Sequence, residues 1–248
     1  MDECWVKRAV RHMTAQLQSV REHIWYFPPD PDAQSPQPGV GIIITPNATV
    51  LVDAGNSPQH ARQIRTVLRE IAAPPVAYII YTHHHWDHTF GAQIWGQPIV
   101  VADEQCRTLL LETYGSHTRH TPHQDGTESA ASLASAATQR VVGDWNAFRL
   151  VPPHITFTGK LSLNVDERTI SLTHIGGQHA PDSIIVRCDD VLFLGDCYYP
   201  PPMYLREPED TLDFAMIEAL LAEQAAIYID AHGLPRTHAE FAQLLAQG

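Results

Sequence analysis

The stretch YTHHHWDHTFG, from Tyr81 to Gly91, places four histidines and one aspartate within eleven residues. Histidine makes up only 15 of the 248 residues, so the pattern His-x-His-x-Asp-His is not expected by chance at this composition. It begins at the end of a short apolar segment, residues 76–82, which has the composition of a strand covered on both faces. Proteins of the α/β class place their sites at the carboxyl ends of such strands. The stretch therefore predicts both a strand end and a functional site.

The spacing within the motif favours two metal ions rather than one. His83 and His85 are two residues apart on an extended or turning segment, so their side chains can point the same way. Asp87 and His88 follow at once and must point elsewhere, although they remain nearby. One ion cannot easily bind all four side chains from so tight a loop, whereas two adjacent ions can. Imidazole and carboxylate ligands suit zinc best, with iron or manganese as alternatives.

Three lone polar residues downstream are candidates for the remaining ligands. His179 lies in the turn sequence HIGGQHAPDS, Asp196 ends the apolar run VLFLGD, and His232 follows the apolar run AIYID. Taken alone, each has an ordinary interpretation as a turn, strand-end or helix-start residue. Their order after the histidine motif favours metal binding for all three.

The rest of the chain alternates between apolar strands and amphipathic helices. Ser57 is the expected N-cap of the first helix and Pro58 its first residue. The second half also contains hairpins, so the fold class is α/β or α+β with mixed sheets, and no repeat or linker divides residues 1–248. We expect strands at about 20–27, 40–45, 49–55, 76–82, 98–103, 160–165, 169–175, 183–188, 191–196 and 226–230, and helices at 57–72, 104–115, 212–224 and from about 236.

Residues 114–151 interrupt this alternation. Much of the segment is polar and then Ala/Ser-rich, without a periodic apolar face, so we interpret it as an insertion or lid over the domain. Its histidines, His117, His120 and His123, are interpreted as loop residues rather than a further metal site.

Charge and composition exclude several classes of partner. The net charge of −12 repels a phosphate backbone, so we expect a small-molecule substrate and no nucleic acid. No apolar run is long enough to span a membrane, and the first residues do not resemble a secretory signal. The four cysteines, Cys4, Cys106, Cys188 and Cys197, are far apart, which indicates reduced thiols and a cytoplasmic location.

Taken in order, these residues resemble the metallo-β-lactamase superfamily. Its pattern is an aspartate ending an early strand, then His-x-His-x-Asp-His, a lone histidine, a lone aspartate or cysteine, and a last histidine. The resemblance covers about residues 40–233 and implies a four-layer αβ/βα sandwich: two mixed β-sheets flanked by helices, with the site along one edge. It also implies the following ligands: His83, His85 and His179 for the first metal; Asp87, His88 and His232 for the second; and Asp196 as a bridge. By the same resemblance, Asp53 and Thr82 would orient these ligands without binding metal.

The implied function is a zinc-dependent hydrolase with two Zn²⁺ per chain. Two ions about 3.5–4 Å apart lower the pKa of a shared water to near 7, and the resulting hydroxide can attack a carbonyl carbon. Asp87 would also move the proton to the leaving group. Tyr199 lies three residues after Asp196, where many related β-lactamases carry a lysine and some lactone-cleaving relatives carry tyrosine. We therefore expect lactonase-like activity, on a lactone, ester or thioester, ahead of β-lactam cleavage.

Three other functions compete with this prediction. A phosphodiesterase or nuclease of the same superfamily is disfavoured by the acidic net charge. A di-iron redox protein would usually carry glutamate at the position of His85. A non-catalytic metal-binding relative would usually have lost part of the ligand set, which is complete here.

Overall fold

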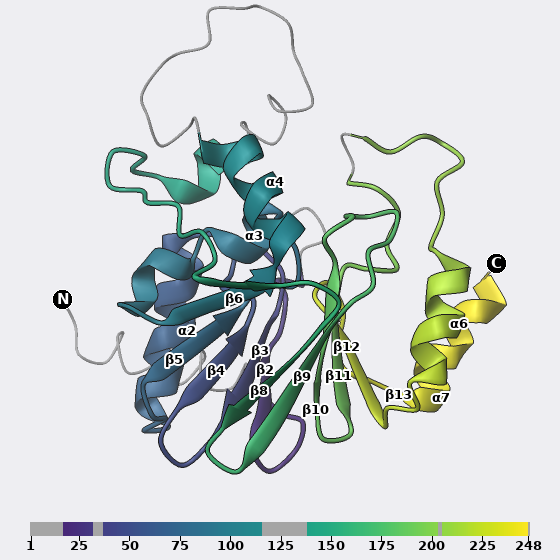
Figure 1. Cartoon of the computed structure of the whole chain (residues 1–248), viewed down its shortest axis with the longest axis horizontal. Helices are drawn as coiled ribbons and strands as arrows, with labels where there is room; N and C mark the ends of the chain where they lie inside the picture. Colours follow the sequence, from purple (N-terminus) through teal and green to yellow (C-terminus); the bar gives the residue numbers. More distant parts are fainter. Residues whose placement is uncertain (1–16, 32–36, 116–137, 203–204, 248) are drawn as a thin grey trace, which may run out of the picture.

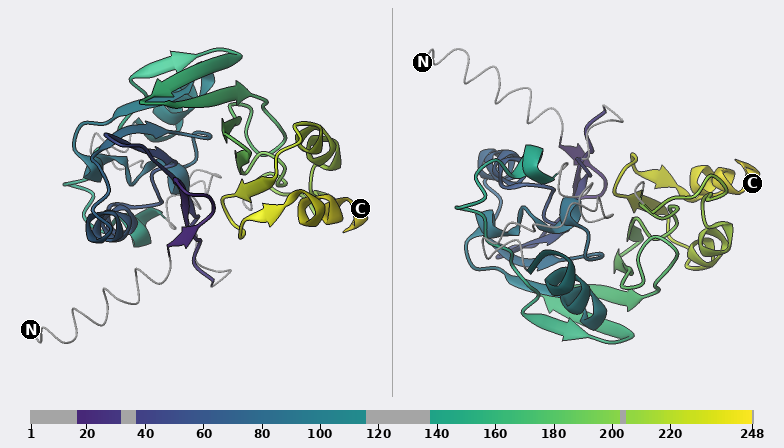
Figure 2. Two further views of the ribbon diagram at one scale, coloured as in Figure 1. Left: turned by 90° about the horizontal axis from the view of Figure 1, so that it is seen from below. Right: turned by 90° about the horizontal axis from the view of Figure 1, so that it is seen from above.

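The computed structural model describes residues 17–31, 37–115, 138–202 and 205–247. Two mixed β-sheets lie face to face, and helices cover their outer faces, which confirms the predicted fold class (Figures 1 and 2). The central part of the predicted insertion, residues 116–137, lies outside the described residues together with its three histidines. Among the described residues, no helix is both long and apolar enough to cross a membrane.

The first sheet has seven strands in sequence order. Its first four strands are antiparallel, and the remaining strands continue parallel to the fourth. The strands are β1 (Gln18–Ser19), β2 (Ile24–Phe27), β3 (Val40–Ile44), β4 (Thr49–Val52), β5 (Val76–Ile80), β6 (Ile99–Asp103) and β7 (Ile155–Phe157). Its outer face packs against α2 (Pro58–Glu70), α3 (Trp86–Thr89), the 3-10 helix η1 (Ala92–Trp95) and α4 (Glu104–Tyr114). As predicted, Ser57 caps α2 by accepting a hydrogen bond from the His60 amide.

The second sheet has six strands in the order β13-β12-β11-β10-β9-β8, and only β11 and β12 are parallel. The strands are β8 (Lys160–Val165), β9 (Arg168–His174), β10 (Ile184–Cys188), β11 (Val191–Gly195), β12 (Ile227–Asp230) and β13 (Arg236–Thr237). The helices that follow it in sequence are α6 (Phe214–Ala222), α7 (His238–Ala242) and the 3-10 helix η3 (Gln243–Gln247). They pack against its outer face through a cluster that includes Leu192, Ile217 and Phe241.

Two predicted element bounds differ from the structure, and one strand was missed. The expected strand at 20–27 is broken by a turn in which the Arg21 amide donates to the Ile24 carbonyl. The helix expected from about residue 236 begins at His238, because Arg236 and Thr237 first pair with β12. The short strand β7 was missed, since its three residues pair only with β6 and carry no periodic signal of their own.

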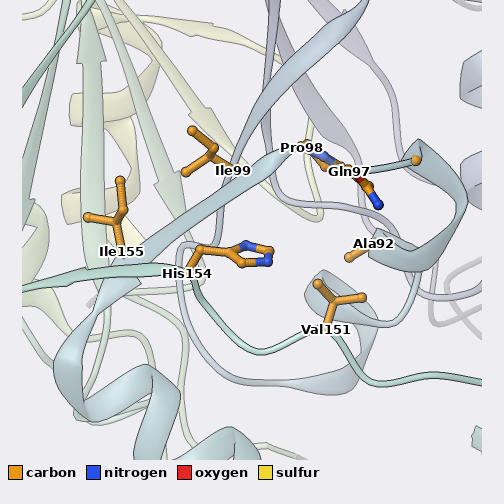
Figure 3. A pocket seen from close by; sticks show the side chains of 8 residues that line it. Ala92, Gln97, Pro98, Ile99, Val151, His154 and Ile155 are labelled. Atoms are coloured by element: carbon orange, nitrogen blue, oxygen red, sulfur yellow. The ribbon is translucent and has the colours of Figure 1, made fainter.

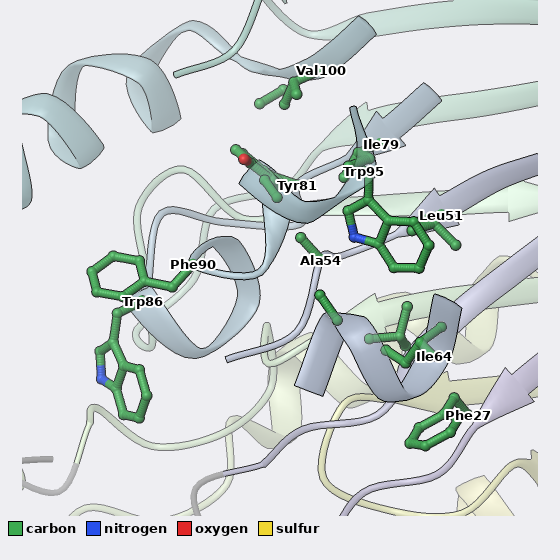
Figure 4. Packing of buried hydrophobic residues seen from close by; sticks show 14 of the residues in the cluster. Phe27, Leu51, Ala54, Ile64, Ile79, Tyr81, Trp86, Phe90, Trp95 and Val100 are labelled. Atoms are coloured by element: carbon green, nitrogen blue, oxygen red, sulfur yellow. The ribbon is translucent and has the colours of Figure 1, made fainter. Parts of the chain in front are cut away.

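A hydrophobic layer joins the two sheets, and another joins the first sheet to its helices. The first-sheet layer includes Leu51, Ile79 and Tyr81 together with Ile64 of α2 (Figure 4). Between the sheets, a Cβ at Gly41 would lie 2.5 Å from the Phe193 ring. Glycine therefore lets the two sheets approach closely at this point.

This architecture gathers the predicted site residues at one edge. The parallel strands β4 and β5 end just before Asp53 and His83. The parallel strands β11 and β12 of the other sheet end just before Asp196 and His232. The β9–β10 turn places His179 at the same edge. At the start of β10, the Ile184 amide donates to the Thr82 carbonyl, directly before His83.

Candidate metal centre

The histidine motif changes conformation in the middle. His85 is extended (φ −61°, ψ 147°) and immediately precedes α3, which starts at Trp86. The His88 amide then donates to the His85 carbonyl at 3.1 Å. The helical turn sends Asp87 and His88 away from His83 and His85, so one short loop serves two neighbouring groups of side chains.

The first group consists of His83, His85 and His179. The Nε2 atom of His83 lies 2.9 Å from Nδ1 of His85, and this Nδ1 lies 3.1 Å from Nε2 of His179. One nitrogen from each ring thus faces a common point, as three ligands of one ion would.

The second group consists of Asp87, His88 and His232. The carboxylate Oδ2 of Asp87 lies 3.7 Å from Nε2 of His88 and 3.8 Å from Nε2 of His232. These donor atoms lie within 4.8 Å of one another, so they can also meet around one ion.

Asp196 lies between the two groups. Its Oδ2 atom is 3.3 Å from Nε2 of His179 in the first group. The same oxygen is 3.5 Å from Nε2 of His88 and 3.0 Å from Nε2 of His232 in the second group. The structure therefore brings all seven predicted ligands together, with Asp196 where a bridging carboxylate would be.

Hydrogen bonds fix which nitrogen of three rings faces the centre. The Nδ1 atoms of His88 and His179 donate to the Asp53 carboxylate and the Pro200 carbonyl, both at 2.8 Å, because neither oxygen can donate. The Thr82 hydroxyl donates to Asp53, so its oxygen accepts from Nδ1 of His83. In each of these three rings, Nε2 therefore keeps a lone pair that faces the centre. This is the tautomer in which Nε2 can bind a metal.

Asp53 connects several of these bonds and is itself held firmly. It accepts the Thr82 amide at 2.8 Å and adopts φ 67°, an uncommon conformation for a residue with a side chain. Gly195 is also required here, because a Cβ at this position would lie 2.6 Å from the Thr82 hydroxyl oxygen. Asp53 and Thr82 thus lie within hydrogen-bond distance of His88 and His83, respectively.

The donor set fits divalent metal ions. Nε2 of His88 and Oδ1 of Asp196 are buried and have no hydrogen-bond partner among the described residues, so the groups aimed at the centre are unsatisfied. Burial lowers the pKa of both His83 and His85 well below its usual range, which favours neutral, ligating imidazoles. Burial raises the pKa of Asp196, but His232 and His88 outweigh this and keep it an ionised carboxylate.

Asp230 is a supporting residue that the sequence analysis missed. Its buried carboxylate accepts from the Tyr198 hydroxyl at 2.6 Å, the Tyr199 hydroxyl at 3.1 Å and the His232 amide at 3.0 Å. Arg236 pairs with the same carboxylate. A signal was available, since an aspartate ends the apolar run AIYID just before His232.

Tyr199 stands beside the centre with its hydroxyl turned to Asp230. Its ring meets the His232 ring edge to face, with centroids 5.9 Å apart. Burial and the neighbouring Asp230 raise the pKa of this phenol, so it stays protonated and donates. A substrate contact by this hydroxyl would require exchange of the Asp230 hydrogen bond.

Two neighbouring residues have packing roles. Nδ1 of His84 lies 2.8 Å from the buried Asp182 carboxylate, so its ring turns away from the centre and ties the motif to the β9–β10 turn. Cys197 is fully buried in the hydrophobic cluster under α6.

A hollow of about 460 Å³ lies away from the centre (Figure 3). Ile99 and Ile155, the first residues of β6 and β7, line it together with Val151 and His154. The strand registers place Ile155 level with Ile80 at the end of β5, but none of the seven proposed metal ligands lines the hollow. It contributes nothing to the metal centre.

Comparison with known proteins gives one family and a consistent set of folds. Residues 37–232 match the family model described as the metallo-beta-lactamase superfamily. Over 219 residues the chain is 24% identical to a linear primary-alkylsulfatase of Pseudomonas sp. (strain ATCC 19151), covering 78% of this chain and 41% of that protein. The chain thus spans about two fifths of the length of this curated relative.

Solved structures with the same fold include metallo-beta-lactamases and an alkyl sulfatase. The metallo-beta-lactamase from Pontibacter korlensis has a TM-score of 0.62 at 17% identity, covering 93% of this chain and 96% of its own. The metallo-beta-lactamase from Hirschia baltica has a TM-score of 0.62 at 18% identity, covering 93% and 95%. A double mutant of the sec-alkyl sulfatase PisA1 has a TM-score of 0.68 at 16% identity, covering 96% of this chain and 42% of its own.

Proposed function

Because this chain belongs to the metallo-beta-lactamase superfamily, we propose that it is a binuclear metal-dependent hydrolase of a small molecule. The observation that carries this proposal is the position of Asp196 Oδ2, within 3.0–3.5 Å of three imidazole nitrogens from separate segments. His83, His85 and His179 would hold one zinc ion, Asp87, His88 and His232 the other, and Asp196 both. Bound zinc would supply Lewis-acid activation of a water nucleophile and of the bond to be cleaved.

The chain's own residues would position ligands and move protons. Asp53 accepts from His88 and, through Thr82, sets the tautomer of His83. The Asp87 side chain is 16% exposed and its Oδ2 faces the centre, so it can carry a proton between the centre and a leaving group. For these two reasons, its exposure and its orientation, we propose Asp87 as the residue that transfers the proton.

We favour a carbonyl substrate, with a lactone or simple ester ahead of a β-lactam. Tyr199 offers a neutral hydroxyl where a lysine would pair with a β-lactam carboxylate, and one missing charged contact costs about 1.5–3 kcal/mol. Arg206, a cation that follows on the same loop, donates to the Pro201 carbonyl. A second cation that could replace the missing lysine, Arg119, lies outside the described residues.

A sulfate ester is the second candidate substrate. It is favoured by the curated relative, a linear primary-alkylsulfatase, and by the sec-alkyl sulfatase among the similar folds. Both relatives are distant, so the carbonyl substrate remains first.

A phosphodiester is the third candidate substrate, and it is disfavoured by the net charge of −12. The cytoplasmic location remains a prediction.

A substrate panel on zinc-loaded protein tests these proposals together. It would contain a nitrophenyl ester, a lactone, a chromogenic cephalosporin, a nitrophenyl sulfate and bis(nitrophenyl) phosphate, each measured as kcat/KM. We expect the lactone or ester to be cleaved fastest, and a clear advantage for the cephalosporin or the sulfate would overturn that ranking. Asp196→Asn should abolish activity, whereas His154→Ala, which removes a histidine that is not among the proposed ligands, should not. Absence of activity on every substrate would contradict a hydrolytic function.

A further inference from the structure

A separate cluster of potential metal ligands lies at the far end of the sandwich from the metal centre. It consists of His23 in the β1–β2 turn, Cys188 at the end of β10 and Asp189 in the β10–β11 turn. One donor atom from each side chain lies within 4.8 Å of the others. The strand β10 begins beside the metal centre and ends at Cys188, so its length of about 13 Å separates the two clusters.

His23 contacts Asp189 without forming a regular hydrogen bond. Nε2 of His23 lies 2.8 Å from Oδ2 of Asp189, yet neither ring nitrogen has a hydrogen-bond partner among the described residues. Only 15% of the His23 side chain is exposed, so two ring nitrogens are largely removed from water. Short contacts without hydrogen-bond alignment are what two ligands of one ion make, because both lone pairs point at the ion rather than at each other.

The surrounding charges leave room for a cation. Arg21 forms a bidentate pair with Asp190, with contacts of 2.7 and 3.0 Å. Arg168 lies 3.2 Å from Oδ2 of Asp189 and 3.9 Å from Glu167. With Cys188 as a thiolate, three carboxylates and one thiolate face two guanidinium groups. The two excess negative charges would be neutralised by a divalent ion.

We propose that His23, Cys188 and Asp189 form a second, structural metal site for zinc or a similar thiophilic divalent ion. The donor set of one imidazole, one thiolate and one carboxylate suits zinc, with water as a fourth ligand on the exposed side of Asp189. On binding, the Cys188 S–H bond breaks, a sulfur–metal bond forms and the proton leaves to solvent. The ion clips the β1–β2 turn to the β10–β11 turn, residues that are 165 or more positions apart in the chain.

Burial sets the cost of this binding. It raises the pKa of Cys188 to about 12, so the thiol is protonated at neutral pH until a metal displaces the proton. Part of the free energy gained from the metal–sulfur bond therefore offsets the cost of ionising the Cys188 thiol. The sulfur and nitrogen donors favour thiophilic ions over magnesium or calcium, which prefer oxygen ligands.

Cobalt substitution tests the site, because thiolate ligation gives Co²⁺ an intense near-ultraviolet sulfur-to-metal charge-transfer band. None of the proposed ligands of the other centre is a cysteine, so a band that disappears in Cys188→Ser reports on Cys188. We expect it in the full chain loaded with cobalt, lost in Cys188→Ser and retained in Cys106→Ser, the matched buried-cysteine control. No band in the wild-type protein, or a band that survives Cys188→Ser, would overturn the proposal.

His23→Gln is the second variant, for the case in which Cys188→Ser does not fold. It should lose the cobalt band and about one equivalent of zinc relative to wild type. Its Tm should also become lower than that of zinc-loaded wild type, while hydrolytic activity stays unchanged. If zinc content and Tm in excess zinc match those of the wild-type protein, His23 and Asp189 form an ion pair only, and the metal site does not exist.

Discussion

At the scale of single residues, His179 shows how one side chain is held for metal binding. Its Nδ1 atom donates to the Pro200 carbonyl at 2.8 Å, and its Nε2 atom faces His85 at 3.1 Å and Asp196 at 3.3 Å. The sequence around it, GGQHAPDS, gives the histidine no partner of its own. The ring is oriented entirely by residues from other parts of the chain.

His179→Ala should lower kcat/KM by at least about 100-fold, equal to about 2.7 kcal/mol of transition-state stabilisation. The reason is the loss of one of three proposed ligands of the first metal. Steady-state kinetics on the best substrate of the panel would measure it, with His154→Ala as a histidine control. Unchanged kinetics in His179→Ala would mean that this residue is only part of a turn.

The ligand candidates could be predicted from the sequence because each is a polar residue at an apolar strand end or in a short turn. The supporting residues could be predicted less well. Asp53 and Thr82 were expected only through the family resemblance. Asp230 ends an apolar run, which marks it as a strand-end residue, but its contacts with Tyr199 and Arg236 could not be predicted because no spacing in the sequence links these segments.

At the scale of elements, the loop after β12 depends on Asp230. The carboxylate binds the His232 amide inside this loop and the Tyr199 hydroxyl from the loop after β11. It also pairs with Arg236 of β13. The two segments that deliver His232 and Asp196 are thus joined through one buried side chain.

Asp230→Asn should weaken binding of the second metal by about 10–100-fold, as expected for a residue that orients a ligand. It should also lower the free energy of unfolding by about 1–3 kcal/mol, because Arg236 loses its charged partner. Competition with a metal chelator measures the first effect and urea unfolding the second.

Asp166→Asn is the matched control for this prediction. Asp166 lies in the β8–β9 turn, at the other end of the sheet. It accepts hydrogen bonds from Thr45 and Asn47 of the β3–β4 turn. Its removal should leave metal affinity unchanged. Equal metal affinity in Asp230→Asn and wild type would show that Asp230 supports the fold without positioning His232.

Element bounds were predictable where the chain carries its own signals. Ser57 and Pro58 start α2 as expected, and β10 and β11 lie within the apolar runs that predicted them. The two-residue strand β13 and the three-residue strand β7 depend instead on pairing with a neighbouring strand. Pairing of this kind is a tertiary effect that no local pattern encodes.

At the scale of the whole molecule, the site exists because two sheets pack with their strand ends aligned. Phe193 of β11 lies in the layer between them, 2% exposed and directly over Gly41 of β3. This layer holds the half of the chain that carries His83 against the half that carries Asp196. Sequence analysis could predict that both sheets exist, but not which residues meet between them.

Phe193→Ala should lower the free energy of unfolding by about 3–5 kcal/mol, because it opens a cavity between the sheets. Urea unfolding followed by both fluorescence and circular dichroism would measure it. A loss below about 1 kcal/mol would contradict the importance assigned to this contact.

The most direct test of a two-metal hydrolase is a zinc titration of metal-free Cys188→Ser, in which the proposed structural site is removed. Hydrolysis of the best substrate is followed as zinc is added in measured equivalents. The account predicts that activity is absent without zinc and rises until about two equivalents are bound. Activity that saturates at one equivalent, or that does not depend on zinc or another divalent metal, would contradict it.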